Sequence, residues 1–319
     1  MDFLRDLRFR LRVDAAALHR IDEGRRAIED RLAAESVRLI AQARKSAQIP
    51  RGGRQLVMGL AANYDVTDLA PFVLSLRESG YEGDVALLTY GCTAETAAFL
   101  RSHAVRMVPF TSLAAMPMSM NSARMFRYLD LMIELFLNAP DNLAYSRIFL
   151  TDIRDVVFQG SPFQNAPDGR VLFFLETQRT IGACPINADW MARAYGHEVL
   201  SELAAQPVSC AGTILGTPDG LLEYLSYMVR HIVAVPPGHR FSGVDQAIHN
   251  YILAKQLVEG SVVVGNGQTV MTVPSTKPTG IRLLDDGRIG NPDGTVSDVV
   301  HQYDRDATVK AAIVARFRA

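Results

Sequence analysis

Hydrophobic and polar positions along the chain change their period near residue 55. Upstream, Ile28, Leu32 and Leu39 recur at helical spacing with charged residues between them, which predicts an amphipathic helical extension over residues 1–54. Downstream, short continuous apolar runs alternate with longer amphipathic stretches. This alternation predicts strands separated by helices, and therefore an α/β domain over residues 55–319.

The first half of that domain has the more regular pattern. Apolar runs predict strands at 56–60, 85–88, 105–108 and 147–151, with helices at 70–79, 93–102 and 122–137 between them. Such strands indicate a mostly parallel central sheet flanked by helices on both faces. Ligands bind beyond the carboxyl ends of strands in sheets of this kind, and Asn63, Tyr90 and Asp152 stand at such ends.

The second half is less regular. The pattern predicts strands at 170–175, 208–215 and 299–301, a helix at 187–203 and a helix that begins at Thr217-Pro218. Residues 262–264 and 268–273 are both apolar and are joined through Gly265-Asn266-Gly267, which predicts a hairpin.

Charge is unevenly distributed although the net charge is −1. Residues 1–54 hold 13 Lys and Arg against 8 Asp and Glu, so the remainder is acidic. An acidic body argues against nucleic acid as a partner. The extension is expected to pack on the main domain or on a second copy of the chain. The alternative is peripheral contact with anionic lipid at the inner face of the membrane.

Composition excludes several other classes. With 48% hydrophobic and 21% charged residues, the chain has ample material for a core. Its three cysteines are widely spaced, and Met1 to Asp6 is too charged for a signal peptide, so a cytoplasmic location is expected. We find no Rossmann fingerprint, P-loop, nucleophile elbow, H-E-x-x-H pair or Cys-x-x-Cys pair.

The most informative stretch is the acidic turn, Asp152-Ile153-Arg154-Asp155, which directly follows the apolar run 148–150. Two carboxylates at the exit of a buried strand cost free energy unless a cation pairs with them. A divalent metal together with the diphosphate of a nucleotide would satisfy both. The structural alternative is a helix cap or a surface cluster of salt bridges.

Three segments, in this order, resemble the motifs of GT-A-fold glycosyltransferases. The acidic turn and the residues after it, D-I-R-D-V-V-F-Q at 152–159, are similar to a D-x-R-D-V-x-F-Q variant of the acidic metal motif. Gly243-Val244-Asp245-Gln246 resembles the D-Q element near the acceptor site. Residues 300–305 resemble the late His-containing segment that closes on the donor diphosphate. The resemblance covers about Gln55 to Asp306, and its second Asp stands three residues after the first instead of the commoner two.

The resemblance implies a GT-A-like fold and transfer of a sugar from a nucleoside-diphosphate donor to a hydroxyl acceptor. It implies a metal centre of Asp152, Asp155 and His301, and an imidazole ligand favours Mn²⁺ over Mg²⁺. Which of the two acids ligates the metal directly stays open. Donor-binding candidates are Ala62, Asn63, Arg124, Arg127, Asp152, Arg154, Asp155, Gly212 and Arg305. Candidates for the catalytic carboxylates are Asp245 and Glu176, and those for acceptor contacts are Asn187, Trp190 and Gln246.

Two alternative functions remain at this stage. A phosphatase-like hydrolase with an aspartyl nucleophile needs its second Asp two residues after the first, where Arg154 stands. A nucleotide-sugar-binding or scaffold protein with a degenerate transferase fold is the other, because no residue is an unambiguous base. The acceptor of a transferase would be a glycan, a lipid-linked sugar or another hydroxyl compound.

Overall fold

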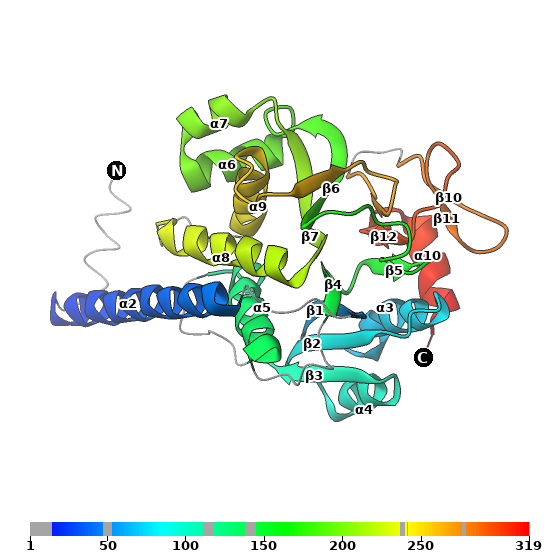
Figure 1. Ribbon diagram of the computed structural model, residues 1–319, viewed down its shortest axis with the longest axis horizontal. Coiled ribbons are helices and arrows are strands. Elements are labelled where there is room, and N and C mark those ends of the chain that lie inside the picture. The colour runs from blue at the N-terminus through cyan, green and yellow to red at the C-terminus, as the bar shows by residue number, and fades with distance from the viewer. Residues whose placement is uncertain are drawn as a thin grey trace, which may run out of the picture.

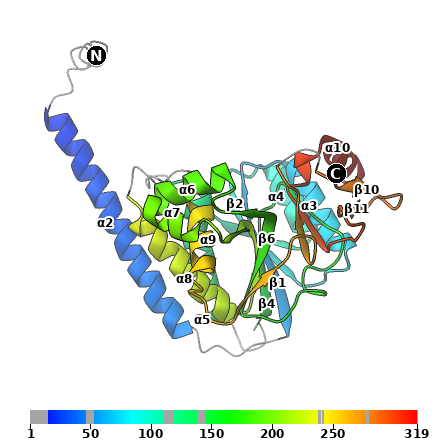
Figure 2. The same ribbon diagram turned by 90° about the horizontal axis from the view of Figure 1, so that it is seen from above.

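A seven-stranded sheet forms the centre of the molecule. The computed structural model describes residues 15–46, 53–110, 118–137, 145–236, 240, 242–275 and 279–318. The strand order in the sheet is β3-β2-β1-β4-β7-β6-β8, and helices lie against both of its faces (Figures 1 and 2). The strands are β1 (Arg54–Ala62), β2 (Asp84–Tyr90), β3 (Val105–Pro109), β4 (Tyr145–Thr151), β6 (Val171–Thr180), β7 (Pro207–Gly216) and β8 (Ser261–Val264).

The sheet is mostly parallel, as the pattern predicts, with one reversed strand. β1 pairs in parallel with β2 and β4, and β2 with β3, but β7 runs antiparallel to both β4 and β6. The reversal places Gly212 of β7 beside the exit of β4, where the backbone N–H of Asp152 donates to the Gly212 carbonyl at 2.7 Å. The strand that delivers the acidic turn is therefore fixed at its carboxyl end.

Side chains of β1 alternate between two cores, because successive residues of a strand point to opposite faces. Leu56 and Met58 join one cluster with helices on one face, and Val57 and Ala61 join a second cluster on the other. The first face is covered by α2 (Ala15–Ser46), α5 (Met120–Leu137), α8 (Pro218–Ala234) and α9 (Val244–Ala254), and the second by α3 (Val66–Glu78) and α4 (Ala94–Ser102).

A second, three-stranded sheet brings the C-terminal region to the acidic turn. Its order is β5-β12-β9, from Val156–Phe158, Val299–His301 and Val270–Thr272. β5 begins directly after the turn, and its antiparallel pairing with β12 sets His301 opposite Val156. Residues 301 and 155 are thus neighbours in space. The remaining C-terminal elements are β10 (Arg282–Leu283), β11 (Ile289–Gly290), the 3₁₀ turn η3 (Tyr303–Arg305) and α10 (Ala307–Arg316).

Two local predictions are wrong. The expected hairpin does not form, because β8 pairs with β6 in the central sheet whereas β9 pairs with β12 in the small one. The expected helix over 187–203 is two helices, α6 (Pro185–Tyr195) and α7 (His197–Leu203), separated by Gly196 at a φ of 89°. Glycine adopts this backbone conformation without a steric cost, so the chain turns there.

The N-terminal helix α2 shares a core with the rest of the molecule. Leu32, Leu39 and Ala43 are buried in the same cluster as residues of α5 and α8, and Figure 1 shows α2 beside α8. Residues 1–14 and 47–52 lie outside the described residues, and the boundary between residues 54 and 55 stays a prediction. No helix in the described part of the chain has both the length and the hydrophobicity to cross a membrane.

Candidate metal and diphosphate site

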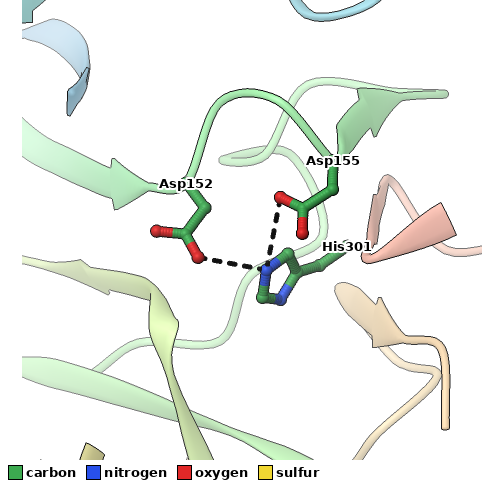
Figure 3. A group of neighbouring side chains, drawn as sticks. All are labelled: Asp152, Asp155 and His301. Carbon is green, nitrogen blue, oxygen red and sulfur yellow. Dashed lines mark ion pairs between the residues drawn. The ribbon is translucent and has the colours of Figure 1, made fainter. Parts of the chain in front are cut away.

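The acidic turn and His301 converge at one point, although 145 residues lie between positions 155 and 301 in the chain. Asp152 lies at the end of β4, Asp155 at the start of β5 and His301 at the end of β12, and both carboxylates are directed at the imidazole (Figure 3). His301 Nε2 lies 3.4 Å from Asp152 Oδ2 and 3.9 Å from Asp155 Oδ1. One potential ligand atom from each of the three residues lies within 4.8 Å of the others.

The imidazole of His301 has a buried nitrogen that is suited to ligate a cation. The side chain is fully buried, and its Nε2 has no hydrogen-bond partner among the described residues. Its other nitrogen, Nδ1, lies 3.5 Å from both Cys210 Sγ and Thr272 Oγ1. A buried polar atom without a partner is costly, and a cation between Nε2 and the two carboxylates would remove that cost. The spacing also fits, since metal–ligand bonds of about 2.0–2.3 Å place ligand atoms roughly 3–4.5 Å apart.

Two features of the surroundings position Asp152. Arg124 of α5 is buried and donates a hydrogen bond to Asp152 Oδ1, while its Nη2 lies 3.8 Å from Asp245 Oδ2. Gly212 leaves room on the other side, because a Cβ there would stand 2.5 Å from Asp152 Oδ2 and 2.7 Å from His301 Cε1. The carboxylate is thus held by a guanidinium and faces a strand that carries no side chain at this position.

Burial and charge act in opposite directions on these groups. Burial opposes ionisation of Asp152, but Arg124 and His301 lower the pKa of Asp152 below its ordinary value. Burial raises the pKa of Asp155. Burial also opposes protonation of His301, yet Cys210, Asp152 and Asp155 together raise the pKa of His301 well above its ordinary value. A metal at this point would displace the imidazolium proton, so its affinity would increase with pH.

A pocket of about 390 Å³ opens next to the two carboxylates. Its walls are the end of β1, the start of α5 and the acidic turn. The residues that line it are Leu60, Ala62, Asn63, Tyr64, Met120, Asn121, Arg124, Asp152, Ile153, Arg154 and Asp155. Six of the residues that the sequence suggests for donor binding therefore share this pocket, and Gly212 lies behind Asp152. Met120 and Asn121 were not predicted, but they stand one helical turn before Arg124, a spacing that places them on the same face.

Two predicted donor-binding arginines do not line the pocket. Arg127 pairs with Asp130 on its own helix. Arg305 donates to the Val273 carbonyl at 2.7 Å, and its Nη1 lies 3.4 Å from Glu176 Oε1. The same contact occupies Glu176, one of the two candidate bases.

The other candidate carboxylate, Asp245, is buried in the first turn of α9. Its Oδ2 faces Arg124, and its Oδ1 has no hydrogen-bond partner among the described residues. Burial raises the pKa of Asp245. Through Arg124, Asp245 is linked to Asp152, so the acidic turn and the start of α9 form one charged group.

The predicted acceptor residues pack around the start of α9, where Asn187 contacts Gln246 and Trp190 contacts Gly243. Gln246 accepts from the Ala211 N–H at 2.8 Å and donates to the Ser209 carbonyl at 2.7 Å and to Asn187 Oδ1 at 3.3 Å. Trp190 covers Gly243, where a Cβ would lie 2.3 Å from the indole ring. Gln246 and Asn187 thus use their amides to fix β7 and α6, whereas Trp190 is partly exposed.

The sequence matches no family model, and a search of curated proteins finds no match. Solved structures are similar at low identity. The galactosyltransferase LgtC, in complex with donor and acceptor sugar analogues, is 14% identical, with 83% of this chain and 96% of that chain covered and a TM-score of 0.49.

Two further solved structures are less similar. Core-mannan synthase A from Aspergillus fumigatus, in its Mn/GDP form, is 11% identical over 66% of this chain and 73% of that chain, with a TM-score of 0.41. Glucosyl-3-phosphoglycerate synthase from Mycobacterium tuberculosis, in complex with Mn²⁺, UDP and glucosyl-3-phosphoglycerate, is 13% identical over 67% and 70%, with a TM-score of 0.36. All three scores are below 0.5, so a function has to be inferred from the geometry of the site.

Proposed function

We propose that this protein is a metal-dependent glycosyltransferase that moves a sugar from a nucleoside-diphosphate donor to a hydroxyl acceptor. The observation that carries the proposal is the convergence, beside a pocket, of Asp152, Asp155 and the Nε2 of His301, which makes no hydrogen bond within the described part of the chain. A second line of support is the resemblance of three sequence segments to GT-A-fold enzymes. These segments are far apart in the chain, yet their residues lie together in the folded protein.

In this proposal the metal is held by Asp152, Asp155 and His301. A divalent cation there would neutralise the charge that develops on the leaving diphosphate. Carboxylates combined with an imidazole favour Mn²⁺ over Mg²⁺, which prefers an all-oxygen shell.

The protein's own residues position the reactants. Arg124 orients Asp152, and Arg154 faces the pocket with an exposed guanidinium that can donate to phosphate oxygens. Ala62 and Asn63 form the wall available to the nucleoside. Oδ1 of Asp245, for which the described residues provide no hydrogen-bond donor, would accept from a hydroxyl of the transferred sugar or of the acceptor. Trp190 offers its partly exposed ring to the acceptor, and Glu176 stays a candidate for the base.

Replacement of Asp155 by Ala tests the metal centre. We expect calorimetry with UDP or GDP to show Mn²⁺-dependent binding by the wild-type protein and its loss in the variant. Asp285→Ala removes an exposed acid elsewhere and should leave binding unchanged. Equal nucleotide affinity in the Asp155→Ala and wild-type proteins would exclude the proposed centre.

A binding protein without turnover is the second candidate, and one observation favours it. The two candidate catalytic carboxylates, Glu176 and Asp245, each already face an arginine of the same chain, and a protein that only binds its ligand needs no catalytic base. Incubation with nucleotide sugars and Mn²⁺ separates the two functions, since a transferase releases the nucleoside diphosphate slowly to water even without an acceptor. Tight donor binding with no release over hours would favour the binding protein.

A further inference from the structure

Arg154 is the most exposed charged side chain that lines the candidate pocket, and a carboxylate of the same chain already engages it. Its Nη1 donates to Asp304 Oδ2 at 3.1 Å, whereas its Nη2 lies 4.0 Å from Asp155 Oδ2. The side chains of Arg154 and Asp304 are 45% and 19% exposed. One arm of the guanidinium is therefore committed to Asp304 by a single hydrogen bond at the edge of the pocket.

The Arg154–Asp304 pair is not what holds the C-terminal segment against the acidic turn. The backbone N–H of Gln302 donates to the Asp155 carbonyl at 2.6 Å, and the Tyr303 hydroxyl donates to the Arg154 carbonyl at 3.3 Å. The pairing of β12 with β5 fixes His301 opposite Val156. These contacts remain when the carboxylate of Asp304 is removed, so that change should leave the turn in place.

We propose that Asp304 competes with the donor diphosphate for Arg154 and so sets the affinity of the site for nucleoside diphosphates. This inference depends on the proposed function of the same pocket. A partly exposed ion pair contributes little to stability, so Arg154 can leave Asp304 at little cost in free energy. A diphosphate offers several charged oxygens and can accept two parallel hydrogen bonds from a guanidinium, where Asp304 accepts one.

The competition has a consequence for turnover. When the diphosphate leaves, Asp304 can take Arg154 back, so the cation is not left unpaired at the pocket. Asp304 therefore weakens donor binding and favours release of the product by the same amount. A residue that only anchored η3 would have the opposite effect on binding, because its removal would loosen the segment that carries His301.

The test is calorimetric titration of UDP and GDP in the presence of Mn²⁺ against wild type, Asp304→Asn, Arg154→Gln and the double variant. We expect Asp304→Asn to bind the nucleotide roughly two- to fivefold more tightly, the factor that corresponds to an exposed ion pair. Arg154→Gln should bind more weakly. In the Arg154→Gln background, Asp304→Asn should change affinity no further, because the competitor has lost its target.

Two controls separate this effect from others. Asp286→Asn removes a similar exposed carboxylate, paired with Arg288 at 2.7 Å and outside the pocket lining, and should not alter binding. Asp304→Ala excludes a new hydrogen bond from the Asn amide to the ligand and should tighten binding as well.

The outcomes are distinct. If the wild-type protein binds neither nucleotide with Mn²⁺, the proposed function fails and the inference fails with it. If the wild-type protein binds but both Asp304 variants bind equally or more weakly, only the inference is overturned. Equal tightening by Asp304→Asn with and without Arg154 would also overturn it, since the effect would then be one of net charge.

Discussion

A side chain at Gly212 would collide with two residues of the candidate site. A Cβ there would approach Asp152 Oδ2 to 2.5 Å and His301 Cε1 to 2.7 Å, distances that require one of the two ligands to move. Neither ligand is free to move, because His301 is fully buried and Asp152 is held by Arg124. The absence of a side chain at Gly212 is thus part of the geometry of the candidate metal site.

We expect Gly212→Ala to lower Mn²⁺ affinity by roughly 10- to 100-fold, the range found when residues that orient ligands are changed. Calorimetric titration with Mn²⁺ would measure this, with thermal unfolding to confirm that the variant folds. Gly53→Ala is the matched control, since a Cβ at Gly53 meets nothing within 4 Å. Wild-type metal affinity in Gly212→Ala would mean that the ion does not lie between Asp152 and His301.

At the scale of elements, β7 is fixed to α9 by a buried polar network. His249 of α9 is fully buried, with Nε2 2.9 Å from Ser209 Oγ and Nδ1 3.0 Å from the Tyr224 hydroxyl. Asn250 accepts from the Ser209 N–H at 2.8 Å and donates to its carbonyl at 3.1 Å. Since β7 also carries Gly212, this network holds in place the strand that packs against Asp152 and His301.

The burial of His249 in this network predicts that the protein becomes less stable at acidic pH. Burial lowers the pKa of His249 from 6.5 to about 3. Between these values the unfolded chain binds a proton that the folded protein does not. The free energy of unfolding therefore falls as the pH falls from 6.5 to 3, by at most about 1.4 kcal/mol per pH unit from this residue. Urea unfolding of wild type and His249→Gln at several pH values would measure both slopes.

The variant should be less stable than wild type at pH 7 because it loses one of two buried hydrogen bonds, but its stability should depend less on pH over this range. His197→Gln, at an exposed position, should keep the wild-type slope. Parallel pH profiles for wild type and His249→Gln would contradict the assignment.

Elements with a strong local pattern were predicted well, and those decided by distant contacts were not. The alternating burial of β1 follows from its own residues. The predicted hairpin at Gly265-Asn266-Gly267 fails for a tertiary reason: the Asn266 amide donates to the carbonyls of Glu176 and Thr272 and accepts from the Thr272 N–H. These bonds direct the chain to the second sheet, where β9 pairs with β12. No local periodicity contains that information.

Within the candidate site, too, some residues could be placed from the sequence and others could not. The carboxylates at the end of β4 could be placed from the strand pattern, and His301 through the resemblance, but the roles of the arginines could not. Arg124 and Arg127 are both on α5, three residues apart, yet one meets Asp152 and the other Asp130. The Arg127–Asp130 pair is local to the helix, whereas the contact of Arg124 with Asp152 depends on where α5 lies against β4, which is set by packing of the whole core.

At the scale of the whole molecule, the N-terminal helix belongs to the packed body. Leu39 is 1% exposed in the cluster that also contains residues of β1, β4, α5 and α8, whereas Val37, two residues earlier, is 68% exposed. The helix thus buries one face and leaves another in solvent. If α2 were only an appendage, the stability of the body would not depend on residues of that buried face.

Replacement of Leu39 by Ala should therefore destabilise the entire body by about 2–5 kcal/mol, the cost of a large-to-small change in a core. Val37→Ala should change stability by less than about 0.5 kcal/mol. The chain has one tryptophan, Trp190, which lies on α6 and reports the body and not α2 itself. Denaturant unfolding followed by Trp190 fluorescence should shift to lower denaturant in Leu39→Ala and coincide with the loss of helical circular dichroism, since cooperative units unfold together. An unchanged fluorescence transition with an early loss of helical signal would show instead that α2 unfolds separately, and the extension would then be an independent element.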